Sequence, residues 1–165
     1  MKNVLLVTLC LFSYIANAQT EKNKLYHPEA DAEKDIAAAI KQAKAENKYV
    51  LIQGGGNWCS WCIEFAGFCK ADPKIDSVIN AGFIWYHLNY SKENENKKVF
   101  AKYGYAQRFG FPVFIILNEK GERIHTQNSV YLEDGKKSYT RARVQEFLGA
   151  KSLESENVRG LVIEY

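Results

Sequence analysis

The sequence predicts a layered α/β domain, in which helices flank a central mixed β-sheet. Short apolar runs rich in β-branched residues alternate with segments of helical periodicity, which is typical of parallel strand pairing. Two further strand-like runs joined by a turn follow, and they predict an antiparallel hairpin and hence a mixed sheet. The chain has 165 residues, 47% of them hydrophobic, which suffices for one such domain with a sizeable core.

The first predicted element is a helix that Asp31 caps and that runs to about Asn47. Apolar residues recur on one face of this helix. Asp72-Pro73 predicts the start of another helix, with Asp at the N-cap and Pro at the first helical position. The predicted elements in order are a helix at 31–47, a strand at 49–53, a helix from the cysteine motif to about 69, a helix from 72 through 79, a strand at 83–88, a helix at 93–103, a strand at 113–117, a turn at 118–121, a strand at 122–126 and a helix at 140–148 capped by Gly149.

The N-terminal residues form a predicted signal peptide at 1–18. Lys2 supplies a positive start, residues 4–15 are mostly apolar, and Ala16-Asn17-Ala18 is a small-X-small cleavage pattern. The apolar run is shorter than the roughly 20 residues of a membrane-spanning helix, which favours cleavage over an uncleaved anchor. We therefore expect an exported protein, in the periplasm or another extracytoplasmic, oxidising compartment.

The remaining chain divides into a polar, flexible leader at 19–30, a folded domain at 31–150 and a C-terminal tail at 151–165 without assigned structure. The formal net charge is +3, from 22 basic and 19 acidic residues spread along the chain. Because no basic stripe or block is present, we expect no nucleic-acid partner. We expect a monomer.

Three cysteines remain once the signal peptide and its Cys10 are removed: Cys59, Cys62 and Cys69. An odd number in an exported protein argues against a purely structural disulfide framework. Cys69 is seven residues beyond Cys62, about 10 Å along a helix, whereas a disulfide needs Cα atoms within about 7 Å. We therefore expect Cys69 to be a buried, inert thiol.

The segment Cys59-Ser60-Trp61-Cys62 follows a predicted strand and opens a predicted helix. Unpaired N–H groups and the helix dipole favour an anion at such a position, so Cys59 is the expected attacking thiolate. Cys62 lies one turn further on and is the expected resolving thiol. Trp58 and Trp61 offer flat apolar surface for a substrate chain.

Two other interpretations compete with a redox pair. A structural Cys59–Cys62 disulfide would close a very short loop and would therefore stabilise the fold little. A zinc site could use the three cysteines and one histidine, but a second close-spaced ligand pair is missing. We assign none of the histidines to catalysis and expect no metal and no bound cofactor.

With Trp58-Cys59-Ser60-Trp61-Cys62, Asp72-Pro73 and Phe109-Gly110-Phe111-Pro112 before an apolar strand, the chain resembles the exported members of the thioredoxin-like superfamily over residues 32–148. The resemblance implies a thioredoxin-like fold. It also implies a cis peptide bond between Phe111 and Pro112, facing the cysteines. The backbone there could pair with an extended substrate, with Phe111 and Pro112 in contact with it. The alternative is a proline that merely begins an edge strand.

The chain departs from the family pattern between and before the cysteines. Thioredoxins have Gly-Pro where this chain has Ser60-Trp61, and a buried Asp where it has Gln53, which cannot titrate. Proton transfer from Cys62 would then depend on water or on Glu64, which we expect to be an exposed helix charge. These changes leave the direction of electron transfer open.

The predicted function is thiol–disulfide exchange with exported protein partners, through the Cys59–Cys62 pair. The protein thiols and disulfides of that compartment are the expected substrates, and an upstream redox partner, plausibly membrane-embedded, is required. The alternative from another class is a non-catalytic binding module that holds partner proteins on Trp58, Trp61 and Phe111.

Overall fold

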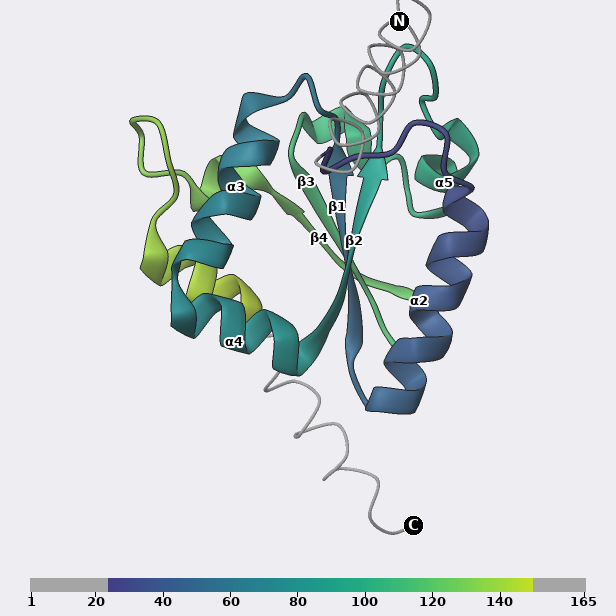
Figure 1. The fold of residues 1–165 in the computed structure, drawn as a ribbon, viewed down its shortest axis with the longest axis horizontal. Coiled ribbons are helices and arrows are strands. Elements are labelled where there is room, and N and C mark those ends of the chain that lie inside the picture. Colours follow the sequence, from purple (N-terminus) through teal and green to yellow (C-terminus); the bar gives the residue numbers. More distant parts are fainter. Residues whose placement is uncertain (1–23, 150–165) are drawn as a thin grey trace, which may run out of the picture.

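A four-stranded mixed β-sheet is the centre of the computed structural model, which describes residues 24–149 (Figure 1). The strands are β1 (Tyr49–Gly55), β2 (Phe83–Asn89), β3 (Val113–Leu117) and β4 (Arg123–Asn128). Their order across the sheet is β2-β1-β3-β4; β1 is parallel to β2 and antiparallel to β3, which is antiparallel to β4. The predicted mixed sheet is confirmed. The predicted signal peptide and C-terminal tail lie outside the described residues.

Helices cover both faces of the sheet. They are α2 (Ala32–Glu46), α3 (Ser60–Ala71), α4 (Pro73–Gly82), α5 (Lys97–Lys102) and a last helix over residues 141–149, with short 3-10 helices η1 (Ala106–Phe109) and η2 (Ser129–Leu132). In Figure 1, α2 and α5 lie on one side of the sheet, and α3, α4 and the yellow-green last helix lie on the other. No helix within residues 24–149 has the length and hydropathy that a membrane span requires.

Side-chain alternation along the strands divides the core into two layers. Val50 and Ile52 pack with α2 and α5, whereas Leu51 packs with α3 and α4. In β3, the Ile115 side chain packs in the layer of α2 and α5, and the residues on either side of it pack in the layer of α3 and α4. Both central strands are therefore buried between the two helical layers and largely apolar, which explains their hydrophobic runs; Gln53 of β1 is the polar exception.

The helix starts predicted at Asp31 and at Asp72-Pro73 are confirmed. The Asp31 carboxylate accepts a hydrogen bond from the Lys34 N–H at 3.1 Å and caps α2. Asp72 ends α3 and also caps α4, because its carboxylate accepts from the backbone of Lys74 at 3.0 Å and Ile75 at 3.3 Å. One residue thus fixes the corner between the two helices on this face.

Two predicted helix ends differ from the structure. Helix α5 begins at Lys97, four residues later than predicted, because Asn94 and Asn96 bond to backbone oxygens outside the helix, those of Pro28 at 2.9 Å and Asn89 at 2.8 Å. Gly149, the predicted cap, lies inside the last described helical turn.

Candidate redox site

Cys59 and Cys62 form a disulfide at the start of α3, just beyond the end of β1. Cys59 is the N-cap residue, and its Sγ accepts a hydrogen bond from the Cys62 N–H at 3.2 Å. This N–H and the dipole of the helix would therefore stabilise a thiolate at Cys59 after reduction. Cys59 is 5% exposed and Cys62 is 0% exposed, so Cys59 is the more accessible residue of the pair.

An aromatic wall, made of Trp58, Tyr90 and Phe111, lies beside the disulfide. The exposed fraction of Trp58 is 60%, and its indole N–H donates to the Tyr90 carbonyl oxygen at 2.7 Å. The Phe111 ring lies edge-on to Trp58, with centroids 5.7 Å apart, and packs against the cysteine pair. The bond between Phe111 and the buried Pro112 is cis, as the family resemblance implied.

Trp61 is placed differently from Trp58. It is half-buried, its ring lies edge-on to Tyr139 with centroids 5.5 Å apart, and its carbonyl oxygen accepts from the Tyr139 hydroxyl at 3.0 Å. Trp61 therefore joins the start of α3 to the core, and Trp58 supplies more of the open aromatic surface.

Gln53 is fully buried behind the disulfide. Its side-chain amide donates two hydrogen bonds, to the Tyr26 hydroxyl at 2.8 Å and to the Cys62 carbonyl oxygen at 2.9 Å. Gln53 therefore holds the backbone of Cys62 in place.

Tyr26 was missed by the sequence analysis, which placed it in a flexible leader. It is fully buried and packs with both cysteines. Asn57 holds its backbone from both sides: the Tyr26 N–H donates to the Asn57 side chain at 3.1 Å, and that side chain donates back to the Tyr26 carbonyl at 2.7 Å. The described end of the predicted leader is thus part of the site. The neighbouring Leu25 was the available signal, because it makes an apolar pair with Tyr26 in an otherwise polar segment.

Glu64 and Cys69 lie on α3 away from the disulfide chemistry. Glu64 is exposed, as expected, and accepts from the Ser138 hydroxyl at 2.7 Å. Cys69 is a buried free thiol, as predicted, and burial with the nearby Asp72 and Asp76 carboxylates raises its pKa to about 12. Residues 24–149 contain no group of three or more His, Cys, Asp or Glu side chains that could hold a metal ion.

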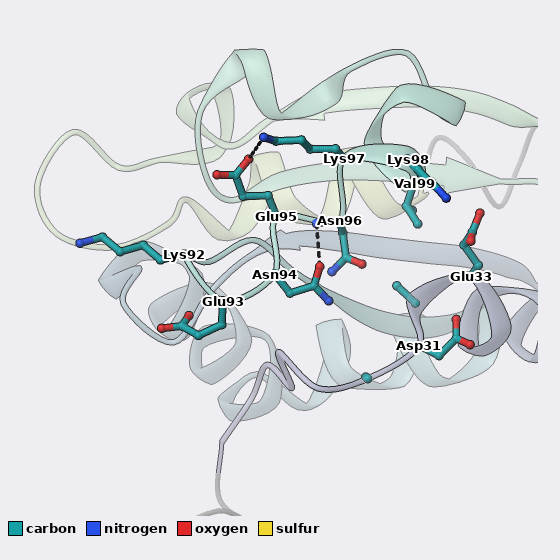
Figure 2. A pocket seen from close by; sticks show the side chains of 12 residues that line it. Asp31, Glu33, Lys92, Glu93, Asn94, Glu95, Asn96, Lys97, Lys98 and Val99 are labelled. Carbon is teal, nitrogen blue, oxygen red and sulfur yellow. Dashed lines mark hydrogen bonds and ion pairs between the residues drawn. The ribbon is translucent and has the colours of Figure 1, made fainter.

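A polar pocket opens between the start of α2 and the loop that leads into α5 (Figure 2). Figure 2 shows that it is lined by side chains of both charges, including Asp31, Glu33 and Lys98, and that Lys97 and Glu95 pair with each other. Neither cysteine of the disulfide lines it. The pocket is therefore separate from the redox site.

Solved structures with the same fold include three redox proteins. A disulphide isomerase from Xylella fastidiosa Temecula1 has 22% identity and a TM-score of 0.68, over 79% of this chain and 98% of the other. The DsbD C-terminal domain of Neisseria meningitidis, in its oxidised form, has 18% identity and a TM-score of 0.53, over 75% and 96%. A thioredoxin from Thermus thermophilus has 18% identity and a TM-score of 0.53, over 72% and 84%. At these identities the likeness shows a shared fold.

The sequence comparisons agree with the fold. No curated protein sequence matches the chain. A family model described as thioredoxin-like matches residues 31–119, which is more than half of the chain and includes the strand before the cysteines, the cysteine pair and the cis proline. The chain belongs to this thioredoxin-like family, with a Cys-X-X-Cys disulfide at the start of α3.

Proposed function

We propose that the protein is a thiol–disulfide oxidoreductase that exchanges disulfides with exported proteins through Cys59 and Cys62. The observation that carries the proposal is the Cys59–Cys62 disulfide at a helix N-terminus, beside an aromatic wall in which Trp58 is exposed. The predicted signal peptide supports export, and the three redox proteins that share the fold support the reaction class.

The reaction begins when a partner thiolate attacks Cys59 Sγ. A partner–Cys59 disulfide forms, the Cys59–Cys62 bond breaks, and its electron pair goes to Cys62 as a thiolate. A second partner thiolate then releases the first partner as a disulfide and leaves Cys59 reduced. In the opposite direction, the Cys59 thiolate attacks a partner disulfide, forms the mixed disulfide and expels one partner sulfur as a thiolate. The Cys62 thiolate then attacks Cys59 Sγ, re-forms the Cys59–Cys62 bond and expels the other partner sulfur as a thiolate, and both partner thiolates take protons from water.

The aromatic wall supplies the docking surface for the partner chain. Trp58 and Phe111 would contact apolar side chains on either side of the partner cysteine, and the backbone before Pro112 would pair with an extended segment. An upstream redox partner, plausibly in the membrane, would restore the starting state of the pair. The direction of electron transfer depends on the reduction potential of the Cys59–Cys62 pair, which a redox titration measures.

Trapping tests the proposal. In the Cys62→Ala variant, a mixed disulfide at Cys59 has no resolving thiol, so exported partners should accumulate as covalent complexes that reducing agent releases. Cys69→Ala is the matched control from the same helix and should trap nothing. If Cys62→Ala forms no complexes and the unsubstituted protein does not reduce insulin, the proposal is wrong. Partners that bind a Cys59→Ser variant as tightly as the unsubstituted protein would instead favour a non-catalytic binding module.

A further inference from the structure

The Tyr26 hydroxyl and the Cys62 sulfur both face Gly55 in the buried cluster behind the redox pair. The two groups meet at Gly55, where a Cβ atom would overlap Cys62 Sγ and would stand only 2.7 Å from Tyr26 Oη. A side chain at residue 55 would therefore displace the sulfur or the hydroxyl. Tyr26, Cys59 and Cys62 form one buried cluster, and both Tyr26 and Cys62 are fully buried.

Gln53 determines which way the Tyr26 hydroxyl points. The Cys62 carbonyl can only accept a hydrogen bond, so the side-chain group of Gln53 that faces it must be the NH2 group. That same NH2 group donates to Tyr26 Oη, which uses a lone pair of the oxygen and leaves the O–H proton to point elsewhere. Within residues 24–149, no acceptor takes this proton in the oxidised protein.

Reduction of the disulfide would place a charge next to this proton. A thiolate at Cys62 would be fully buried, and a buried charge is costly unless a donor bonds to it. The Tyr26 phenol is suited to this, because burial raises its pKa above the ordinary value and keeps it protonated.

We propose that the Tyr26 hydroxyl donates a hydrogen bond to the Cys62 thiolate and thereby assists both departure of this sulfur from the disulfide and its attack on a mixed disulfide. The inference rests on the proposed exchange reaction and assigns Tyr26 a part in it. Tyr26 gains and loses no proton. The electron pair of the broken S–S bond goes to Cys62 Sγ, and the proton that later neutralises this thiolate comes from water.

The other titratable groups near Cys62 do not replace this donor. His87 on β2 lies edge-on to the Tyr26 ring, with centroids 5.5 Å apart, and is not among the residues that pack against the cysteine cluster. Burial lowers its pKa to about 4, so it supplies no positive charge at neutral pH. Glu64 is exposed and bonds to Ser138, and the Tyr139 hydroxyl donates to the carbonyl of Trp61. Cys59 is the other sulfur of the pair.

Substitution of Tyr26 with Phe tests the proposal, because it removes the hydroxyl and keeps the ring. The matched control is Tyr103→Phe, since Tyr103 is also buried, lies in the core layer under α2 and α5, and has a hydroxyl without a hydrogen-bond partner among residues 24–149. We expect Tyr26→Phe to slow reduction of the disulfide by dithiothreitol about tenfold, because a hydrogen bond to a charged group is lost. Tyr103→Phe should leave the rate unchanged.

A second measurement does not need exchange activity. In a Cys59→Ser background, the ¹³Cβ shift of Cys62 reports its ionisation, and Tyr26→Phe should raise the pH midpoint by about 1. In the protein with Tyr26 in place, the ¹³Cζ shift of Tyr26 should follow the same midpoint. If the midpoint does not move and the Tyr26 signal ignores the ionisation of Cys62, the inference is wrong, even where the unsubstituted protein exchanges disulfides. If dithiothreitol leaves the disulfide of the unsubstituted protein intact, the proposed function is wrong, and the pH midpoint still decides the role of Tyr26.

Discussion

The two ends of α3 place the same residue type in opposite chemical situations. At the N-terminal end, Cys59 caps the helix, receives the Cys62 N–H and lies beside exposed Trp58. Near the C-terminal end, Cys69 is fully buried in the core layer between the sheet and helices α3 and α4, close to the Asp72 carboxylate. The first setting stabilises a thiolate and the second opposes it. Reactivity therefore depends on the position of a cysteine along the helix as well as on its presence.

The largest expected effect is on exchange activity. Cys59→Ser removes the attacking sulfur and should reduce the rate of insulin reduction by a factor on the order of 1,000. Cys69→Ala, at the other end of the same helix, should leave this rate unchanged. Turbidity of insulin in dithiothreitol measures both. A comparable loss in Cys69→Ala would contradict the separation of the two ends.

The second effect is on alkylation of the reduced, folded protein. With a pKa of about 12, Cys69 at pH 7 is thiolate to a fraction of about 0.00001, and burial excludes the reagent as well. Cys59 should react with iodoacetamide at least about 100 times faster. At pH values below 12, the thiolate fraction of Cys69 should rise about tenfold for each increase of one pH unit, because higher pH favours deprotonation. Peptide mass spectrometry distinguishes the sites, and rapid labelling of Cys69 at pH 7 would refute the comparison.

A third, smaller effect is on stability. Cys69→Ala removes a buried sulfur that packs between α3 and the sheet, so we expect a loss of about 1 kcal/mol in the free energy of unfolding. Urea unfolding followed by circular dichroism measures the change. Unaltered stability would show that the C-terminal end of α3 is loosely packed, contrary to the contacts of Cys69.

The smallest effect is expected at Glu64, between the two ends. Glu64→Gln should leave both the exchange rate and its pH dependence unchanged, because the carboxylate is exposed and bonds to Ser138 at 2.7 Å. The measurement is the insulin assay repeated from pH 6 to pH 9. A shift of the pH profile would assign the proton transfer to Glu64 in place of water.

Local sequence patterns predicted most of the fold and the cysteine pair. Helix caps such as Asp31 and Asp72, and the apolar run of β3, act over a few residues and can be read directly. Tyr26 could not be recognised in this way, because its partners Gln53 and Asn57 lie 27 and 31 residues away in the chain. The start of α5 was misplaced for the same reason, since Asn94 bonds to Pro28 across 66 residues. Side chains that bridge distant segments leave no periodic signal.

A redox titration with counted thiols tests the central claim most directly. The purified protein is equilibrated in glutathione buffers of graded potential and alkylated while folded. Mass spectrometry then counts the alkylated thiols. We predict a single two-electron transition in which Cys59 and Cys62 gain or lose reactivity together while Cys69 stays unlabelled. The midpoint would also assign the protein as a disulfide donor or a reductase. A pair that resists reduction until the protein unfolds, or a disulfide that includes Cys69, would contradict the account.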